Sequence, residues 1–413
     1  MLDFNKITIQ IHSFTAEHAR GLPHFQAARA EAGRRLRASG PTWEETQARI
    51  DSSRTSWLVA DLMESPDRTY TPPPRPLPCA VLATDGSQIV ADRHDIALCY
   101  LINIGLIALR YGTGERAYLH SRPTLAQPDE DLLDEFQGEQ TAIAPRRLTM
   151  RRLLAELAGL AEMIAANAPP EISPAGNGST PPSASAPPTL ALLDGTLILW
   201  PLEAESETFR AEALSAFQTQ LEIARQHRVP LAGYISKPAS RDVVNALRIF
   251  HCPHPRADCD RYCPNRSKPR PDFVAPDCAG TERITDAELF EPLLAPGERS
   301  AVFGSRSKIL NLYDEVHRIR FFYLNIGREV ARVEIPDWVA ADPELLAWTQ
   351  SLCYDQAQKG DGYPVALAEA HELAIVRGVE RDAFFRLVER EFVRTGLPVT
   401  ATRKSISKRA RRV

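Results

Sequence analysis

Apolar runs of strand length recur along this 413-residue chain and alternate with segments of helical periodicity. Three short apolar runs, typical of buried strands, cover 79 to 84, 190 to 193 and 231 to 235. A longer apolar stretch from 95 to 111, followed by one at 118 to 120, predicts a meander of paired strands after the first run. Strands that alternate with helices indicate an α/β domain.

The clearest predicted helix covers 147 to 166, where one apolar stripe recurs at spacings of three and four residues: Leu153, Leu157, Leu160 and Ile164. Other helices are expected between the strands and toward both ends of the chain. Their ranges are 16 to 39, 41 to 63, 206 to 227, 310 to 317, 343 to 357 and 365 to 378. The expected architecture is therefore a sheet flanked by helices.

Proline-rich segments divide the chain, because its 33 prolines gather in a few clusters. The predicted order is a helical arm over 1 to 64, a stiff connector over 65 to 78, an α/β domain over 79 to 390 and a tail over 391 to 413. The stretch from 169 to 189 is rich in Pro, Ser, Gly and Ala and is expected to be disordered. The stretch from 251 to 280 lacks periodicity and is interpreted as a Cys-rich insertion.

The formal net charge of -4 gives the chain no overall attraction to phosphate, so nucleic-acid binding would need a local basic groove or metal ions. Basic residues gather in the tail, which is either a solvated terminus or an arm that follows phosphates: Arg403, Lys404, Lys408, Arg409, Arg411 and Arg412. No segment has the pattern of a signal peptide, and no apolar run approaches the roughly 18 residues of a membrane span. These features predict a cytoplasmic protein without a membrane partner.

Two predicted strands close on the same motif, an aspartate followed by a glycine and a hydroxyl residue: Asp85-Gly86-Ser87 and Asp194-Gly195-Thr196. A carboxylate at the end of a buried strand is costly unless a cation or hydrogen-bond donors meet it, and the glycine lets a ligand come close. Asp-Gly is also ordinary turn chemistry, so either motif alone is ambiguous. Because the motif occurs twice, each time after a strand, the pair favours a shared metal site.

Phosphodiester cleavage with divalent ions needs about three or four oxygen-rich ligands, so a third carboxylate is expected. The helix over 147 to 166 offers Glu156 and Glu162. At about 100° per residue, Glu162 points away from the apolar stripe, whereas Glu156 flanks it and can face the sheet. Glu156 is the favoured ligand, and a glutamate that only contacts solvent is the alternative.

Three further residues are candidates for the same site. Lys237 follows the third short strand, where open α/β sheets build their sites, and is either a phosphate contact or a surface residue. Tyr363 stands at the start of a late helix and is either a packing aromatic or a site residue. His371 shares a helix face with Leu367 and Ile375, which predicts an inward side chain that serves the core or the site.

Four of the seven cysteines crowd into the insertion beside two histidines: Cys252, Cys259, Cys263 and Cys278. Their C-x6-C-x3-C-x14-C spacing is not that of a standard zinc ribbon. Structural Zn²⁺ is the favoured explanation, with an iron–sulfur centre and free thiols as alternatives. Thiolates suit soft metals, so such an ion would not take part in phosphodiester cleavage.

Taken together, the motifs resemble those of the NurA family of nucleases: DGS after the first strand, DRHDIALCYLINIG, a helix glutamate, LLDGT, GYISK and GYPVALAEAHELAIV. The resemblance covers about residues 80 to 390 without the two interruptions. It implies an RNase H-like α/β fold, with a mixed sheet core flanked by helices. It also implies Mn²⁺- or Mg²⁺-dependent endonuclease action on single-stranded DNA and 5′ to 3′ exonuclease action.

The resemblance also assigns residues and partners. It places metal-binding acids at Asp85, Glu156 and Asp194, and matches a late histidine, a late tyrosine and a strand-end lysine of the family to His371, Tyr363 and Lys237. In the mechanism that we expect, His371 completes the metal ligands, Lys237 binds the phosphate, and Tyr363 orients water or stacks on a base. The proline-rich loop departs from the family pattern, because it lengthens the distance from the glutamate to the second aspartate. The implied partners are DNA, as single strands and duplex ends, a second copy in a homodimer, and a HerA-like hexameric ATPase that acts with the nuclease in DNA end resection and repair.

Two other functions stay open. One is a catalytically silent DNA-binding adaptor of a motor ATPase, and the other is a different RNase H-like enzyme, such as a nuclease for RNA/DNA hybrids or a nucleotidyl-transferase. A silent relative should have lost an acid, yet Asp85, Asp194 and His371 are all present. The sugar of the substrate cannot be inferred from these residues, since metal ions recognise phosphate.

Overall fold

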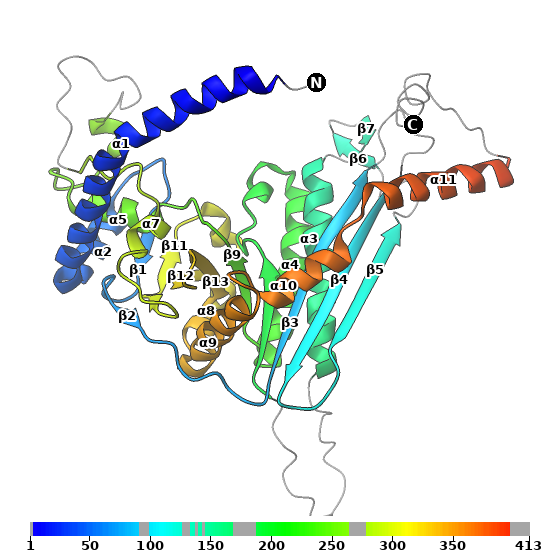
Figure 1. Ribbon diagram of the computed structural model, residues 1–413. Helices are drawn as coiled ribbons and strands as arrows, with labels where there is room; N and C mark the ends of the chain where they lie inside the picture. Colours follow the sequence, from blue (N-terminus) through cyan, green and yellow to red (C-terminus); the bar gives the residue numbers. More distant parts are fainter. Residues whose placement is uncertain are drawn as a thin grey trace, which may run out of the picture.

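The computed structural model describes residues 3–90, 99–125, 133–136, 139–142, 145–167, 187–263 and 278–396. Its strands are β1 (Ala60–Leu62), β2 (Thr69–Tyr70), β3 (Cys79–Val90), β4 (Tyr100–Tyr111), β5 (Tyr118–Leu125), β6 (Leu133–Phe136), β7 (Glu139–Ala142), β8 (Thr189–Asp194), β9 (Leu231–Ile235), β10 (Arg299–Ser300), β11 (Phe303–Ser305), β12 (Ile319–Asn325) and β13 (Val330–Pro336). Within these ranges, eleven strands form one sheet in the order β1-β11-β12-β13-β9-β8-β3-β4-β5, joined by β10 and β2 beside β12 (Figure 1). β6 and β7 pair with each other.

The sheet is mixed, and its parallel part lies in the middle. β3, β8 and β9 run parallel, with Thr84 opposite Leu193 and Leu193 opposite Gly233, whereas the other pairs are antiparallel. Parallel neighbours need crossover connections. These contain α3 (Pro145–Asn167) between β3 and β8, and α4 (Glu207–Gln226) between β8 and β9.

Helices cover both faces of the central strands. α3 and α4 bury one face with side chains such as Leu157 and Phe217. On the other face lie α9 (Pro343–Lys359) and α10 (Val365–Ala374), whose Leu352 and Ala370 pack against strand residues. A side chain at Gly105 of β4 would collide with the Ala370 carbonyl oxygen. The missing side chain therefore lets α10 rest directly on the sheet.

A helical layer closes the other end of the sheet. It comprises α1 (Phe4–Ser39), α2 (Trp43–Ser52), α5 (Asp242–Phe250) and α7 (Asp286–Phe290), which share a core with β11 and β12. The first half of α1 extends away from the body (Figure 1). The remaining helical segments are η1 (Gly40–Thr42), η2 (Trp200–Ala204), α6 (Cys259–Tyr262), η3 (Lys308–Leu312), η4 (Glu315–His317), α8 (Asp337–Ala340) and α11 (Gly378–Arg394). No helix in the described ranges is long and apolar enough to cross a membrane.

The helix-flanked α/β sheet expected from the sequence is confirmed, and so are the strands at 79, 190 and 231. Several boundaries were wrong. The helix over 41 to 63 ends at Ser52, and β1 follows it; the helix over 310 to 317 is two short 3-10 turns; and the helix over 365 to 378 stops at Ala374. Most of the 169 to 189 loop, residues 264 to 277 of the Cys-rich insertion, and the basic tail after 396 lie outside the described residues.

One error concerns the site itself. Asp85 does not end a strand, because β3 continues through it to Val90 and pairs with β4 along its whole length. The neighbouring strand β8 does end at Asp194, as expected. The sheet therefore has an open step beside Asp85, where one strand stops and its neighbour continues.

Candidate active site

Three carboxylates meet at this step in the sheet. Thr84 lies opposite Leu193, so Asp85 and Asp194 are neighbours on the same face. Glu156 comes from α3 on the opposite face. All three line one pocket of about 390 Å³ together with His371. Asp85 is 9% exposed and Glu156 only 3%.

Gly86 lets the third carboxylate reach the first. A side chain at Gly86 would collide with Glu156 Oε1 and crowd Arg152. Arg152, one helical turn before Glu156, donates from Nη1 to the Gly86 carbonyl oxygen, and its Nε lies 3.5 Å from Glu156 Oε1. The glycine of the DGS motif thus makes room for α3 to deliver a glutamate and an arginine past the strand.

Burial and crowding change the acidity of these groups. Burial raises the pKa of Glu156 to about 8, nearby Arg152 opposes this rise, and the charges of Asp85 and Asp194 add to it. Burial also raises the pKa of Asp194, against a lowering hydrogen bond from Tyr363. Glu156 Oε1 is buried and has no hydrogen-bond partner among the described residues. Three acids with one unpaired oxygen are costly unless a cation neutralises them.

These residues fit a hard divalent cation by their chemistry. Carboxylate oxygens suit Mn²⁺ and Mg²⁺, and Glu156 Oε1 accepts no hydrogen bond from the described residues although Arg152 Nε lies 3.5 Å away, so this oxygen is available to a cation. However, no group of three or more His, Cys, Asp and Glu side chains in the described ranges is already arranged to hold an ion. A cation would therefore have to draw the side chains closer together.

His371 reaches the acids from outside the core. Its Nδ1 lies 2.7 Å from Asp85 Oδ2, and its side chain is 59% exposed. The inward side chain expected from the face shared with Leu367 was wrong, because the last turn of α10 lies over the pocket mouth. A buried core histidine is thereby excluded.

Tyr363 and Lys237 lie differently with respect to the pocket. Tyr363 packs edge-on against Tyr234, with ring centroids 5.7 Å apart, and its hydroxyl hydrogen-bonds Asp194. Burial raises the pKa of Tyr363 far above its usual range, so the hydroxyl stays a donor. Lys237 is exposed in a left-handed turn after β9, with φ of 44°, and does not line the pocket.

The choice between the two helix glutamates follows from their surroundings. Glu162 is 60% exposed and pairs with Arg122 at 2.7 Å, whereas Glu156 lies in the pocket. The two basic residues that line the pocket, Arg146 and Arg152, were not singled out from the sequence. Their signal was the RRLTMRRLLAE pattern, which places arginines one and nearly three turns before Glu156.

The four insertion cysteines gather around a second, much smaller cavity. Cys252, Cys259, Cys263 and Cys278 line a space of about 10 Å³. No disulfide joins them, and their thiols are not arranged as a finished metal site in the described ranges. Arg49 of α2 donates to the carbonyl oxygen of Cys252 at 2.6 Å, which ties this segment to the helical layer.

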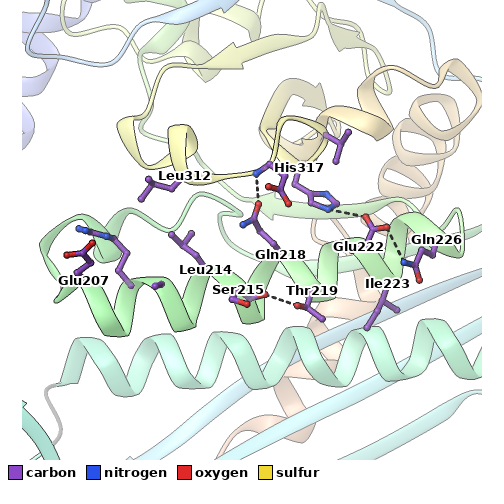
Figure 2. A pocket seen from close by; sticks show the side chains of 14 residues that line it. Glu207, Leu214, Ser215, Gln218, Thr219, Glu222, Ile223, Gln226, Leu312 and His317 are labelled. Atoms are coloured by element: carbon purple, nitrogen blue, oxygen red, sulfur yellow. Dashed lines mark hydrogen bonds and ion pairs between the residues drawn. The ribbon is translucent and has the colours of Figure 1, made fainter.

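Another hollow of the described surface holds none of these residues. It is a groove of about 740 Å³ between α4 and the η3–η4 segment (Figure 2). There His317 Nε2 lies 3.3 Å from Glu222, and Gln218 accepts from the Asp314 amide. This groove has one carboxylate–imidazole pair, but among the described residues it has no cluster of buried carboxylates like the one in the pocket of Asp85.

Metal-free protein should lose stability relative to a Glu156→Gln variant as the pH rises from about 4.5 to about 8. The raised pKa means that the unfolded chain releases this proton at lower pH than the folded protein does. The stability gap should widen through that window to a few kcal/mol and then level off. Urea unfolding in EDTA across this range measures it, with exposed Glu162→Gln as the control. A gap that stays constant would show that Glu156 is not held neutral.

Comparison with known proteins places the chain in a family. The crystal structure of the NurA nuclease from Sulfolobus solfataricus shares 13% sequence identity over 79% of this chain and 88% of that chain, with a TM-score of 0.47. Another NurA structure shares 11% identity over 86% and 96%, with a TM-score of 0.35, and one bound to dAMP and manganese shares 12% over 78% and 90%, with a TM-score of 0.33. No curated protein matches the chain. The NurA domain profile matches residues 79–376, well over half of the sequence, and the chain therefore belongs to the NurA family.

Proposed function

We propose that this protein is a divalent-metal-dependent DNA nuclease whose active site is the pocket of Asp85, Glu156 and Asp194. The observation that carries the proposal is the buried Glu156 carboxylate, whose Oε1 accepts no hydrogen bond from the described residues, beside two aspartates. Such a cluster is costly in an empty pocket and suits a cation that binds phosphate. Membership in the NurA family supports a nuclease.

The metal ligands we propose are Asp85, Glu156, Asp194 and His371, and the ion is Mn²⁺ or Mg²⁺. A NurA protein has been crystallised with manganese. Bound divalent ions would supply Lewis-acid stabilisation of the leaving oxygen and a more acidic water. The protein's own part is to hold the oxygen ligands: His371 orients the Asp85 carboxylate, and Tyr363 donates to that of Asp194.

Positive side chains on the pocket wall would bind the substrate phosphate. Arg152 and Arg146 line the pocket, and a guanidinium matches phosphate with two parallel donors. Lys237 lies outside the lining, so we propose that it contacts a neighbouring phosphate of the bound strand and not the one that is cut. Charge-assisted contacts of this kind hold the strand without reading its sequence.

The finer activity we propose is endonuclease action on single strands and 5′ to 3′ exonuclease action, in cytoplasmic DNA end resection with a HerA-like ATPase. A silent adaptor is the less favoured function, because the raised pKa of Glu156 marks a carboxyl held for chemistry at a cost to folding. A nuclease for RNA/DNA hybrids differs only in the sugar of its substrate. A single assay on DNA, RNA and hybrid substrates separates the three functions.

Asp85→Ala and Asp194→Ala should each abolish cleavage, by on the order of a thousandfold or more, because each removes a carboxylate from the site. His371→Ala should be weaker but still severe. The assay uses labelled single-stranded DNA, duplex DNA, RNA and an RNA/DNA hybrid with Mn²⁺, Mg²⁺ or EDTA.

Glu156→Gln and Glu162→Gln form a matched pair on one helix for the same assay. The first should be inactive and the second fully active, since Glu162 faces solvent and pairs with Arg122. Wild-type turnover in a folded Asp85→Ala or Asp194→Ala protein would sink the proposed site.

We further propose a structural Zn²⁺ at Cys252, Cys259, Cys263 and Cys278, because the four thiols border one cavity of about 10 Å³, roughly the room that one small ion needs. Protein purified without chelator should carry about one Zn²⁺ per chain. Cys259→Ser should lose the metal, whereas Cys353→Ala, which alters a buried cysteine outside the cavity, should keep it. Elemental analysis without zinc or iron in the wild type would rule out both metals.

The assembly we propose is a homodimer that uses the helical arm and the helices after residue 340. Large apolar side chains on α1 and α11 support this, since Ile9 is 72% and Val379 77% exposed. Light scattering should give twice the chain mass, and a HerA-like motor with ATP should increase DNA cleavage. A monomer at micromolar concentration with full activity and no response to the motor would contradict this assembly.

A further inference from the structure

We infer that Glu334 of β13 is a positioning residue that fixes the turn carrying Asp194. The inference rests on the proposed function of the pocket. Glu334 lies outside the pocket lining and is only 1% exposed. Its Oε2 accepts hydrogen bonds from Thr196 Oγ1 at 2.7 Å and from the Leu197 amide at 2.8 Å. Both donors belong to the turn that begins at Asp194.

The turn reaches Glu334 because β9, the strand between them, lacks a side chain at Gly233. Gly233 pairs with Leu193 on one side and with Glu334 on the other. A Cβ at Gly233 would lie 2.6 Å from the Gly195 carbonyl oxygen. The chain after Asp194 therefore crosses over β9 in contact with its backbone, and only glycine permits this.

The turn is held from both sides. Gly195 has a φ of +106°, which favours glycine, and its amide donates to the Tyr234 carbonyl oxygen at 2.9 Å. Thr196 Oγ1 donates to Glu334 and accepts from the Ile198 amide at 3.0 Å. The third residue of the Asp-Gly-Thr motif thus has a specific task, which is to connect the active-site turn to a buried carboxylate.

Glu334 is itself fixed by a buried ion-pair network. Arg332 donates from Nε to Glu334 Oε1 at 2.9 Å and from Nη1 to Asp242 Oδ2 at 3.0 Å. The Arg332 guanidinium also lies over the Phe321 ring, 3.6 Å from its centroid. A buried charged network whose hydrogen bonds are all satisfied has one stable arrangement. These contacts connect Asp242, at the start of α5, through Arg332 and Glu334 of β13 to the Asp194 turn.

The test substitutes the hydroxyl that links the turn to Glu334. Thr196→Val removes the hydrogen bonds of Thr196 Oγ1 to Glu334 and to the Ile198 amide at nearly constant volume, and Thr196→Ser restores the hydroxyl. Thr219→Val is the matched control, because Thr219 only bonds a backbone oxygen on the exposed side of α4. The readouts are Mn²⁺ affinity by isothermal titration calorimetry, kcat and KM on single-stranded DNA, and urea unfolding.

Thr196→Val should bind Mn²⁺ about tenfold more weakly and show about tenfold lower kcat, with KM for DNA within about twofold, because outer contacts of metal ligands typically have effects of this size. Thr196→Ser and Thr219→Val should match the wild type. A folded Thr196→Val protein with wild-type Mn²⁺ affinity and kcat would overturn the inference alone. A wild type that neither binds Mn²⁺ nor cuts DNA would overturn the proposed function, and this inference with it.

Discussion

The parallel pairing of β3 with β8 is the contact on which the site depends. It sets Asp85 beside Asp194, and it leaves an open step because β3 continues where β8 stops. The crossover that parallel strands require is the segment that contains α3, the helix that delivers Glu156. Two antiparallel strands of the sheet also contribute. β4 packs against α10, which carries His371, and β13 carries Glu334, which accepts hydrogen bonds from the Asp194 turn. The side chains of the site thus come from different strands of one sheet and from helices that pack against it.

The buried cluster of acids lowers the stability of the folded protein. An unpaired oxygen on Glu156 and a carboxyl pKa near 8 mean that the folded protein holds an unfavourable group in its interior. Arg152 moderates this cost from 3.5 Å away, without making a hydrogen bond through Nε. Elsewhere the fold treats buried charge differently, since Arg332 has two carboxylate partners and an aromatic ring. The hydrogen bonds of the Glu334 carboxylate are satisfied, whereas Glu156 Oε1 accepts none from the described residues, and this contrast supports the roles proposed for the two glutamates.

Much of this could be predicted from the sequence, because the apolar runs of β3, β8 and β9 are short and the stripe of α3 is regular. Asp194 was singled out from a strand end and Glu156 from helix phase, whereas Asp85 was singled out by its motif although β3 continues through it. The hairpin of β12 and β13 was missed, since polar residues such as Arg332 and Glu334 interrupt its apolar pattern from within the core. Glu334 could not be predicted at all, because its meaning depends on a turn that crosses Gly233 about a hundred residues earlier in the chain. Helix phase placed His371 on an inward face, but it could not show that the face extends past the sheet.

The contact between α10 and β4 has a mechanical consequence. Side chains normally separate a helix from the sheet beneath it, but here the Ala370 carbonyl lies against the bare backbone of Gly105. Among the described residues, no layer of side chains separates the helix from the strand at this point. Gly105 also pairs directly with Asp85, so the same residue contacts the strand that carries the carboxylate and the helix that carries the imidazole. We therefore expect bending of the sheet at this point to move Asp85 and the helix that carries His371 together.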